Sequence, residues 1–406
     1  MPIACCRRTD RSWHPTSLLL LALMLGQPAW SNDALEAPPP TQPTQPTLDT
    51  QVMVPRLEVS EPEGPPQDEA DGVYAGEDTD SELDDPEAEV VDVEPVPTVA
   101  VTAPEPLEPP PLARLEIMLD WYPSPRHAAL ILAGDNGALT RNGLEVVLST
   151  PADPNVPTRM LAAGRIDLAV TRQPLLHLQV DRGLPLVRVA TLVSVPLAAL
   201  ILRENQDDVP LARLAGQRIG YSDEDGRDIL LPMLIQPHGI RSEELTLLDA
   251  NFDLATAMIE GQLDGLIGSM RLQLPRMLGD EGVSTRMLRV EEHGVPLHDG
   301  LILVANRDRL NGQKPSIRKL IAALEETTAW MIEYPDEAWQ RLVEAEPGID
   351  TPANREAWPD ILRRFTTRPA AMDQQRYGSF ERLLHDRGLV SEETPVYRLA
   401  VDPWAP

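Results

Sequence analysis

An acidic residue and two aromatic residues stand together where a strand-like segment ends. The alternating segment 115–119 is followed by Asp120, Trp121 and Tyr122, and prolines come next. A carboxylate can accept hydrogen bonds from an amine, and aromatic rings can stack on a flat molecule. The alternative is an aspartate that caps a turn beside core aromatic residues. Because such a cluster between a strand and prolines is poorly explained as core, we expect it to bind a ligand.

Two other segments carry residues of the same kind at strand ends. Tyr221 ends a second strand-like segment, where its ring could close the other side of a cleft. Glu291, Glu292 and His293 come just before a third strand-like segment. One of these carboxylates could hydrogen-bond an amine or amidine edge, and a solvated charge pair is the alternative.

The residues that metal and enzyme sites require are not arranged for those tasks. In the segment 292–299, Gly294 and Pro296 break any helix, so its acidic residues and histidines share no single face for a metal ion. No Ser–His–Asp order, zinc signature or phosphate-binding glycine loop is visible in the sequence. We therefore expect no catalytic residue, no metal and no cofactor.

Proline and negative charge are concentrated in one segment. Of the 406 residues, 35–112 contain 17 of the 42 prolines, 20 acidic residues and one basic residue. Such a segment cannot bury enough apolar surface to offset its ordering entropy, so we expect a disordered, extended linker over 32–112. It is either a spacer or a solvated tail. The net charge of −29 and the lack of a basic patch argue against nucleic acid and anionic lipid as partners.

The first residues are typical of a secretory signal peptide. Arg7 and Arg8 precede the apolar run 17–25, and small residues follow as far as Ser31. The apolar run is too short to span a bilayer of about 30 Å. We expect a signal peptide over 1–31 and a periplasmic protein. The alternative is an uncleaved signal segment that anchors the chain.

Strand-like and helical segments alternate from residue 113 onward, which predicts a sheet covered by helices. A weak internal repeat relates segment 160–170 to segment 258–267. Each copy has a helix end, a glycine suited to a left-handed cap, an aspartate three residues later and a buried strand. The two copies, about 97 residues apart, indicate two lobes of similar construction.

The strand-like segments 197–202 and 301–305 bracket the second copy of the repeat, so the chain should cross between the lobes twice. We expect an α/β protein with a two-lobed fold and a double hinge crossover, which is suited to ligand capture by hinge bending. The ligand should lie in the cleft between the lobes. The expected bounds are 113–200 with 300–406 for the first lobe and 201–299 for the second.

The segment 119–127, Leu-Asp-Trp-Tyr-Pro-Ser-Pro-Arg-His, resembles the opening motif of the thiamine-pyrimidine substrate-binding proteins, which are grouped with the yeast pyrimidine-precursor synthase. The resemblance covers nearly all of 114–390. The other matching segments, in order, are 143–146, 163–170, 173–177, 220–222, 291–296 and 301–308.

This resemblance implies the type II periplasmic-binding-protein fold and a role in an ABC importer. It implies hydroxymethylpyrimidine-like ligands, including formylated aminomethylpyrimidine, and an inner-membrane ABC permease as partner. We expect a monomer. His127 occupies the position of the motif's histidine. It either contacts the ligand or forms a hydrogen bond with a buried backbone group. The candidate ligand-binding residues are Asp120, Trp121, Tyr122, His127, Tyr221, Glu291, Glu292 and His293.

The chain departs from the family pattern at several places. Ser124 and Arg126 replace two asparagines of the opening motif, and the acidic turn 223–226 stands where relatives often have a glycine-rich turn. His298 and Gly300 occupy positions that are often tyrosine and glutamate. The acids favour a cationic or neutral heterocycle over an anion.

The departures motivate a second hypothesis, which is a tethered sensor or scaffold whose ligand specificity has changed or been lost. A third hypothesis is a pyrimidine-precursor synthase. That chemistry needs a lysine for a Schiff base, and the chain has only Lys314 and Lys319, on a predicted helix start. The yeast enzyme's cysteine-rich iron motif is also absent from the sequence.

Overall fold

The computed structural model describes residues 111–204 and 211–405. The signal peptide expected over 1–31 and nearly all of the linker expected over 32–112 lie outside the described residues. No helix in the described part of the chain is long and apolar enough to cross a membrane.

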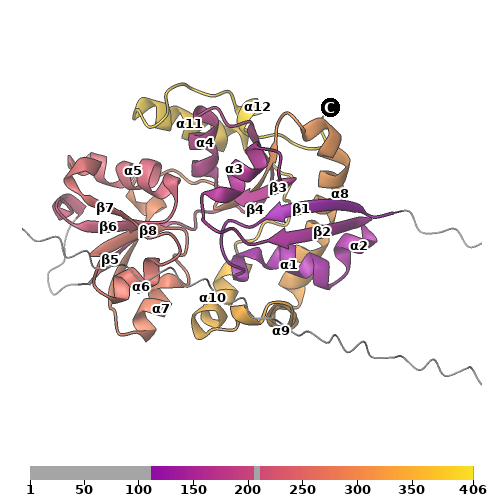
Figure 1. The fold of residues 1–406 in the computed structure, drawn as a ribbon, viewed down its shortest axis with the longest axis horizontal. Helices are drawn as coiled ribbons and strands as arrows, with labels where there is room; N and C mark the ends of the chain where they lie inside the picture. Colours follow the sequence, from indigo (N-terminus) through magenta and orange to yellow (C-terminus); the bar gives the residue numbers. More distant parts are fainter. Residues whose placement is uncertain (1–110, 205–210, 406) are drawn as a thin grey trace, which may run out of the picture. The chain divides into compact units, whose positions relative to one another are not determined.

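Two five-stranded mixed sheets organise the chain, and each forms the centre of one lobe (Figure 1). In the first sheet the order is β2-β1-β3-β10-β4, and in the second it is β7-β6-β8-β5-β9. The strands of the first lobe are β1 (Ala113–Met118), β2 (Leu144–Ser149), β3 (Leu168–Thr171), β4 (Leu186–Val193) and β10 (Leu301–Asn306). The strands of the second lobe are β5 (Ala199–Arg203), β6 (Arg218–Tyr221), β7 (Thr246–Asp249), β8 (Gly265–Gly268) and β9 (Thr285–Arg289).

In each sheet four strands run in the same direction, and the fifth, which follows a crossover from the other lobe, runs antiparallel to both of its neighbours. β1 pairs in parallel with β2 and β3, while β10 pairs antiparallel with β3 and β4. In the second sheet β6 pairs in parallel with β7 and β8, while β5 pairs antiparallel with β8 and β9. This shared plan confirms the expected α/β fold of two similarly built lobes with a double crossover.

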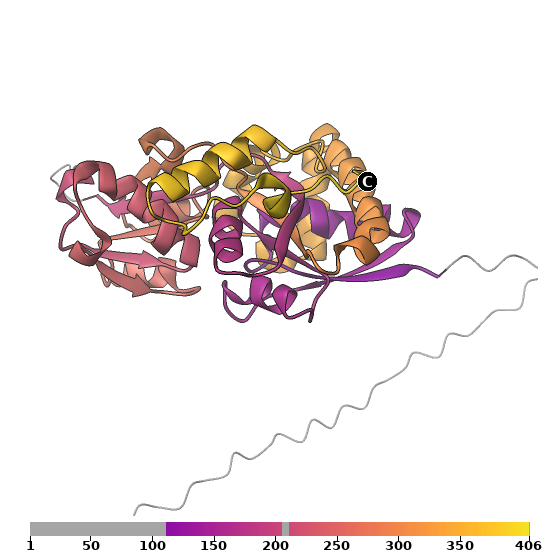
Figure 2. The same cartoon turned by 90° about the horizontal axis from the view of Figure 1, so that it is seen from above.

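Helices cover both faces of each sheet (Figures 1 and 2). In the first lobe they are α1 (Ala128–Asp135), α2 (Ala138–Arg141), α3 (Val156–Ala162), α4 (Gln173–Asp181), α8 (Leu310–Glu333), α9 (Pro335–Ala345), α10 (Pro352–Leu362), α11 (Gln374–Asp386) and α12 (Val396–Leu399). In the second lobe they are α5 (Leu231–Ile235), α6 (Leu254–Ile259) and α7 (Leu274–Asp280).

The internal repeat has a structural meaning. Gly164 and Gly261 both have left-handed backbone conformations, with φ of 68° and 72°, where a side chain would be strained. The aspartate that follows each glycine performs the same task in each lobe. Asp167 accepts a hydrogen bond from the backbone N–H of Glu116 in β1, and Asp264 accepts one from Arg218 in β6, both at 2.9 Å.

The C-terminal helix α11 joins the two lobes. Phe380 and Leu384 on this helix belong to one hydrophobic cluster with Leu175 of α4 and Leu231 of α5. Figure 2 shows α11, in yellow, lying across the first lobe and reaching toward the second. The chain passes between the sheets at 194–198 and at 290–300. The expected lobe bounds stay a prediction about how the chain divides into domains.

Candidate functional site

Asp120 lies at the carboxyl end of β1 and is the centre of a buried polar cluster. Its Oδ1 accepts a hydrogen bond from His127 Nε2 at 2.9 Å. Its Oδ2 accepts one from Arg172 Nη1 at 3.1 Å and lies 3.2 Å from Arg126 Nη2. Burial alone would raise the pKa of Asp120, but Arg126, the His127 hydrogen bond and Arg172 hold it well below its usual range, so the carboxylate is ionised.

His127 is fully buried and uses both ring nitrogens within the protein. Its Nδ1 accepts a hydrogen bond from the backbone N–H of Ser124 at 3.2 Å, so the proton lies on Nε2 and is donated to Asp120. Burial lowers the pKa of His127 even though Asp120 acts in the opposite direction. A neutral histidine in this position orients Asp120.

The acidic turn after β6 brings two more buried carboxylates to the same cluster from the second lobe. Arg172, just before α4 in the first lobe, donates from Nε and Nη2 to both oxygens of Asp225, at 3.1 and 2.9 Å. The same Nη2 is 3.0 Å from Asp223 Oδ1. Burial opposes the charge of Arg172, but Asp223 and Asp225 raise its pKa well above the usual value. The arginine was not singled out from the sequence, and it joins the lobes.

Arg126, the second departure from the opening motif, also reaches across the cleft. Its Nη1 donates a hydrogen bond at 3.0 Å to Ser269 Oγ, which follows β8 in the second lobe. The remaining nitrogens, Nε and Nη2, are buried without a hydrogen-bond acceptor. Arg126 therefore links the lobes and still has donors to offer in the cleft.

All of these side chains are shielded from water. The side chains of Asp120, Arg126, His127, Arg172, Asp223 and Asp225 belong to residues that are at most 4 % exposed. The two lobes are therefore packed directly against each other at this cluster. A ligand can enter only after the lobes separate here.

Aromatic rings close another part of the cleft. Trp121 is buried and meets Phe252 of the second lobe edge to face, with ring centroids 4.6 Å apart. Tyr122 is half exposed and lies tilted on the same Phe252 ring at 4.5 Å. Asn251 has a left-handed backbone, with φ of 47°, and its Nδ2 donates to Asp153 Oδ2 of the first lobe at 3.1 Å. The sequence reasoning missed Phe252, although an aromatic residue in a polar turn was a usable signal.

Tyr221 ends β6, on the same strand edge that leads into the acidic turn. Its ring is half-buried, the guanidinium of Arg227 lies 5.3 Å from the ring centroid, and Arg227 Nη1 donates to the hydroxyl at 3.4 Å. The ring also packs against the hydrophobic cluster that includes α5 and α11. Tyr221 thus contacts Arg227 and this hydrophobic cluster, and its role in ligand binding stays a prediction.

Glu291, Glu292 and His293 share one short helical turn before β10, but their side chains have different surroundings. Glu291 accepts two contacts from Arg271 Nη1, at 2.7 and 2.9 Å. Glu292 is exposed and pairs with Arg289 at 2.9 Å, as a surface ion pair does. His293 is half-buried. Asp120 and His127 are therefore brought together with Asp223 and Asp225, whereas Glu292 faces solvent.

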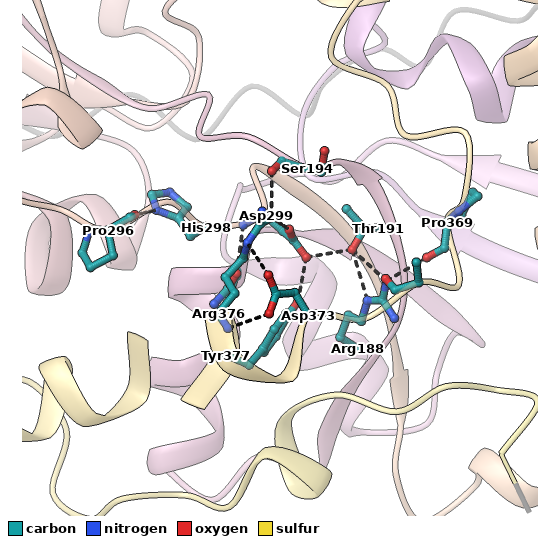
Figure 3. Close-up of polar contacts among 12 residues, drawn as sticks. Arg188, Thr191, Ser194, Pro296, His298, Asp299, Pro369, Asp373, Arg376 and Tyr377 are labelled. Atoms are coloured by element: carbon teal, nitrogen blue, oxygen red, sulfur yellow. Dashed lines mark hydrogen bonds and ion pairs between the residues drawn. The ribbon is translucent and has the colours of Figure 1, made fainter. Parts of the chain in front are cut away.

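A second polar cluster holds the two crossovers (Figure 3). Asp299, in the return crossover, accepts hydrogen bonds from Thr191 of β4 at 2.7 Å and from Tyr377 of α11 at 3.1 Å. Arg376 of α11 donates to Asp299 Oδ1 at 2.6 Å and to the Ser194 carbonyl in the first crossover at 2.8 Å. One helix thus holds both connections between the lobes.

Close packing explains Gly300. A Cβ at position 300 would lie 2.2 Å from the carbonyl oxygen of Val195 and 3.0 Å from Leu197, so the two crossovers touch at this glycine. His298 is buried beside it, and its Nδ1 contacts the Pro296 carbonyl at 2.9 Å. Burial lowers the pKa of His298 to about 4, so its ring is neutral at pH 7.

A cavity of about 600 Å³ lies beside the crossover cluster and is lined by Thr191, Ser194, Asp299, Thr366, Arg368, Ala371, Met372, Asp373, Gln374 and Arg376. Its most buried charges, on Asp299 and Arg376, already pair with each other. Within 111–204 and 211–405, no group of three or more His, Cys, Asp or Glu side chains is placed to hold a metal ion. The interlobe cluster is therefore the stronger candidate for a ligand site.

Comparison with known proteins agrees with this picture. The family model described as "NMT1/THI5 like" matches residues 124–338. The chain is 36 % identical over 290 residues to a putative thiamine biosynthesis protein of Haemophilus influenzae, covering 71 % of this chain and 92 % of that one. It is 30 % identical over 251 residues to the formylaminopyrimidine-binding protein of Halalkalibacterium halodurans, covering 62 % and 76 %. A 4-amino-5-hydroxymethyl-2-methylpyrimidine phosphate synthase of Uromyces fabae is 25 % identical, covering 60 % and 74 %.

Solved structures show the same fold. The alkanesulfonate-binding protein SsuA from Xanthomonas axonopodis, bound to MOPS, matches with a TM-score of 0.57 and 17 % identity, covering 72 % of this chain and 99 % of that one. A Candida albicans protein with the generic periplasmic-binding-protein fold matches with a TM-score of 0.59 and 16 % identity, covering 72 % and 97 %. The described part of the chain therefore has the fold of periplasmic binding proteins.

Proposed function

The chain belongs to the NMT1/THI5-like family, and we propose that it is a periplasmic substrate-binding protein that captures a thiamine-precursor pyrimidine between its lobes for an ABC permease. The fold and the family support a substrate-binding role. Beyond that role, we propose three specific points: that the ligand is a pyrimidine, that the partner is an ABC permease, and that the protein is periplasmic.

One observation carries the proposal, which is that the polar and aromatic residues of the opening motif meet the second lobe. Asp120 and Trp121 follow β1, and both are connected to second-lobe residues, directly for Trp121 and through Arg172 for Asp120. An aminopyrimidine offers amine donors and ring-nitrogen acceptors at its edge and a flat face. Carboxylates, the free donors of Arg126 and the rings of Trp121 and Phe252 complement those features.

Capture follows from a shift in population. A ligand that contacts both lobes binds the closed form better than the open form, so it favours closure. In the closed form the interlobe contacts of Arg172 and Arg126 are already made. The ligand must therefore add contacts to a cleft that the protein's own side chains hold together.

The synthase hypothesis has little support in the structure. Both lysines lie on α8, where Lys314 Nζ donates to the Ala405 carbonyl and Lys319 Nζ lies beside Gly143. Neither belongs to the interlobe cluster that would have to hold a Schiff base. A binding protein, not an enzyme, is therefore the function that we propose.

A scaffold without a ligand is the second candidate, because one specific observation favours it. The protein's own side chains, through the buried link between Arg172 and Asp225, hold the two lobes together. A protein that had lost its ligand could keep its lobes together in this way.

Isothermal titration of the full chain, freed of endogenous ligand, separates these functions. We expect saturable binding of hydroxymethylpyrimidine or its formylaminomethyl analogue at micromolar or lower concentration. An alkanesulfonate should not bind, because the buried carboxylates repel an anion. Binding of no pyrimidine up to millimolar concentration, by a chain that melts cooperatively, would support the scaffold.

Two variants make the test specific. Asp120→Asn should weaken pyrimidine binding at least about tenfold, since it removes the carboxylate that accepts from His127 and Arg172 and pairs with Arg126. Glu244→Gln changes an exposed carboxylate that pairs with Arg241, and it should bind as the parent does. Equal loss in both variants would mean that the effect is not local to the cleft.

A further inference from the structure

The charges buried in the closed cleft do not balance. Asp120, Asp223 and Asp225 contribute three carboxylates, while Arg126 and Arg172 contribute two guanidinium groups. His127 is neutral because its Nδ1 accepts a backbone hydrogen bond. The cluster therefore holds one excess negative charge when all three carboxylates are ionised.

The groups around this cluster do not supply the missing positive charge. Glu224, in the same acidic turn, is paired at the surface with Arg159 and Arg182. His298, from the return crossover, is neutral at pH 7. Arg271 and Arg376 are already paired with carboxylates of their own, Glu291 and Asp299 respectively.

Asp223 carries the excess. Its Oδ1 is buried and accepts no hydrogen bond, and its Oδ2 contacts only the Ser222 hydroxyl, at 3.4 Å. Arg172 Nη2 lies 3.0 Å from Oδ1, but that nitrogen already donates to Asp225. Burial, partly offset by Arg172, raises the pKa of Asp223 to about 6. A buried carboxylate oxygen that accepts no hydrogen bond, and whose ion-pair partner Arg172 is shared with Asp225, can take a further donor with positive charge.

The opposite side of the cluster shows what else the missing group should carry. Arg126 Nε and Nη2 are buried donors without acceptors, and Arg126 lies near enough to Asp223 to affect its pKa. A ligand that satisfies both residues needs a cationic donor and a hydrogen-bond acceptor. Trp121, which follows Asp120 in the chain, also meets the second lobe, through the ring of Phe252. A protonated aminopyrimidine combines these features, because its amidinium edge donates hydrogen bonds and its unprotonated ring nitrogen accepts one.

We infer that Asp223 selects the charge of the ligand, and that the cleft takes planar heterocycles with a protonated amidine edge in preference to neutral or anionic ones. The inference rests on the proposed function, because it names the charge class of the ligand at that same site. A 4-aminopyrimidine would bind with a proton on a ring nitrogen, and Asp223 Oδ1 would accept from it. The ligand would thereby neutralise the excess charge in the closed form.

Calorimetry of the full chain with three matched probes tests the inference. Benzamidine is a planar permanent cation, benzamide is its neutral counterpart, and 4-amino-2-methylpyrimidine can take up a proton. At pH 7.5 we expect benzamidine to bind at least about tenfold more tightly than benzamide. Titrating the pyrimidine in two buffers of different ionisation enthalpy should show uptake of a proton.

Two variants distinguish a loss of charge selection from a loss of folding. Asp223→Asn should lose the preference for benzamidine but keep its affinity for benzamide, because it removes charge without changing shape. Glu244→Gln should keep the preference. Thermal melts of each variant show that it is folded.

The outcomes separate this inference from the proposed function. Pyrimidine binding without proton uptake, with benzamide as good as benzamidine, would overturn the inference and leave the function standing. Benzamidine binding that depends on Asp223, with no binding of hydroxymethylpyrimidine, would support the charge selection and overturn the pyrimidine function. If no probe binds a folded chain, both fall.

Discussion

The guanidinium of Arg172 in the first lobe holds both carboxylate oxygens of Asp225 in the second, at 2.9 and 3.1 Å, and both residues are buried. The same arginine donates to Asp120. The charge that fixes the opening motif is therefore also the charge that fixes the closed position of the second lobe. Asp120 and the acidic turn of the second lobe are therefore connected through one side chain.

Removal of this side chain should open the cleft. In Arg172→Met, Asp120 and Asp225 lose a buried partner, and breaking a buried ion pair costs about 3–5 kcal/mol if the site stays dry. The lobes can avoid that cost by separating, which hydrates the carboxylates. We expect faster hydrogen exchange, measured by mass spectrometry, in 119–127 and 222–226.

Arg241→Ala is the matched control, since it removes an arginine from an exposed pair with Glu244. Its exchange in both segments should equal that of the parent. Unchanged exchange in Arg172→Met would show that the ion pairs do not hold the closed form.

Asp223 should make the chain less stable at high pH. Its pKa is about 6 in the folded chain and 3.8 ordinarily, so the folded chain keeps a proton that the unfolded chain has released. The free energy of unfolding therefore decreases as the pH rises from about 4 through 6, and the full cost is ~3 kcal/mol. Asp223→Asn should be more stable than the parent at pH 8, with a gain that disappears near pH 4.

Urea unfolding at several pH values measures this difference. His127 and His298 titrate in the opposite direction, because burial lowers the pKa of each, but they are present in both chains and cancel in the comparison. A variant less stable than the parent at pH 8 would mean that attraction to Arg172 outweighs burial.

Phe252 should be needed for the environment of Trp121. In Phe252→Ala the edge-to-face contact across the cleft is lost, which is worth about 0.5–1.5 kcal/mol beyond buried area. We expect a red shift of tryptophan emission and weaker pyrimidine binding. Ile332→Ala, on the exposed side of α8, should change neither. An unaltered emission spectrum in Phe252→Ala would contradict the contact.

Alanine substitutions at two glycines should change the free energy of unfolding in opposite directions. Gly300→Ala places a Cβ 2.2 Å from the Val195 carbonyl, so the crossovers must move apart, and we expect a loss of about 1–3 kcal/mol. Gly312→Ala, within α8, meets no atom within 4 Å and should gain about 0.5–1 kcal/mol. Chemical denaturation measures both, and equal effects would refute the packing of the crossovers.

Local signals in the sequence were sufficient for the architecture. Left-handed glycines such as Gly164 and Gly261 and the alternation of strands and helices depend on neighbouring residues, so the two lobes could be anticipated. The motif around Asp120 was visible for the same reason. The contacts of Asp120 could not be predicted, because its partner Arg172 is 52 residues further along the chain and Asp225, which Arg172 also binds, is another 53.

The acidic turn shows the limit of reasoning from composition. From the sequence, residues 223–225 indicated repulsion of anions, but they gave no sign that Arg172 would be buried among them. Burial decides whether a carboxylate is solvated or paired, and burial depends on tertiary structure. The docking of α11 on both crossovers through Arg376 likewise needed the folded chain.

The central claim is that a pyrimidine is bound between the lobes beside Trp121. The most direct measurement is a titration of tryptophan emission of the full chain, freed of endogenous ligand, with hydroxymethylpyrimidine and its formylaminomethyl analogue. We predict a saturable change in tryptophan emission at micromolar ligand. The change should disappear in Trp121→Phe and should persist in Glu244→Gln. In Asp120→Asn it should require a much higher ligand concentration. An emission that stays constant up to millimolar ligand, in a chain that calorimetry also finds not to bind, would contradict the claim.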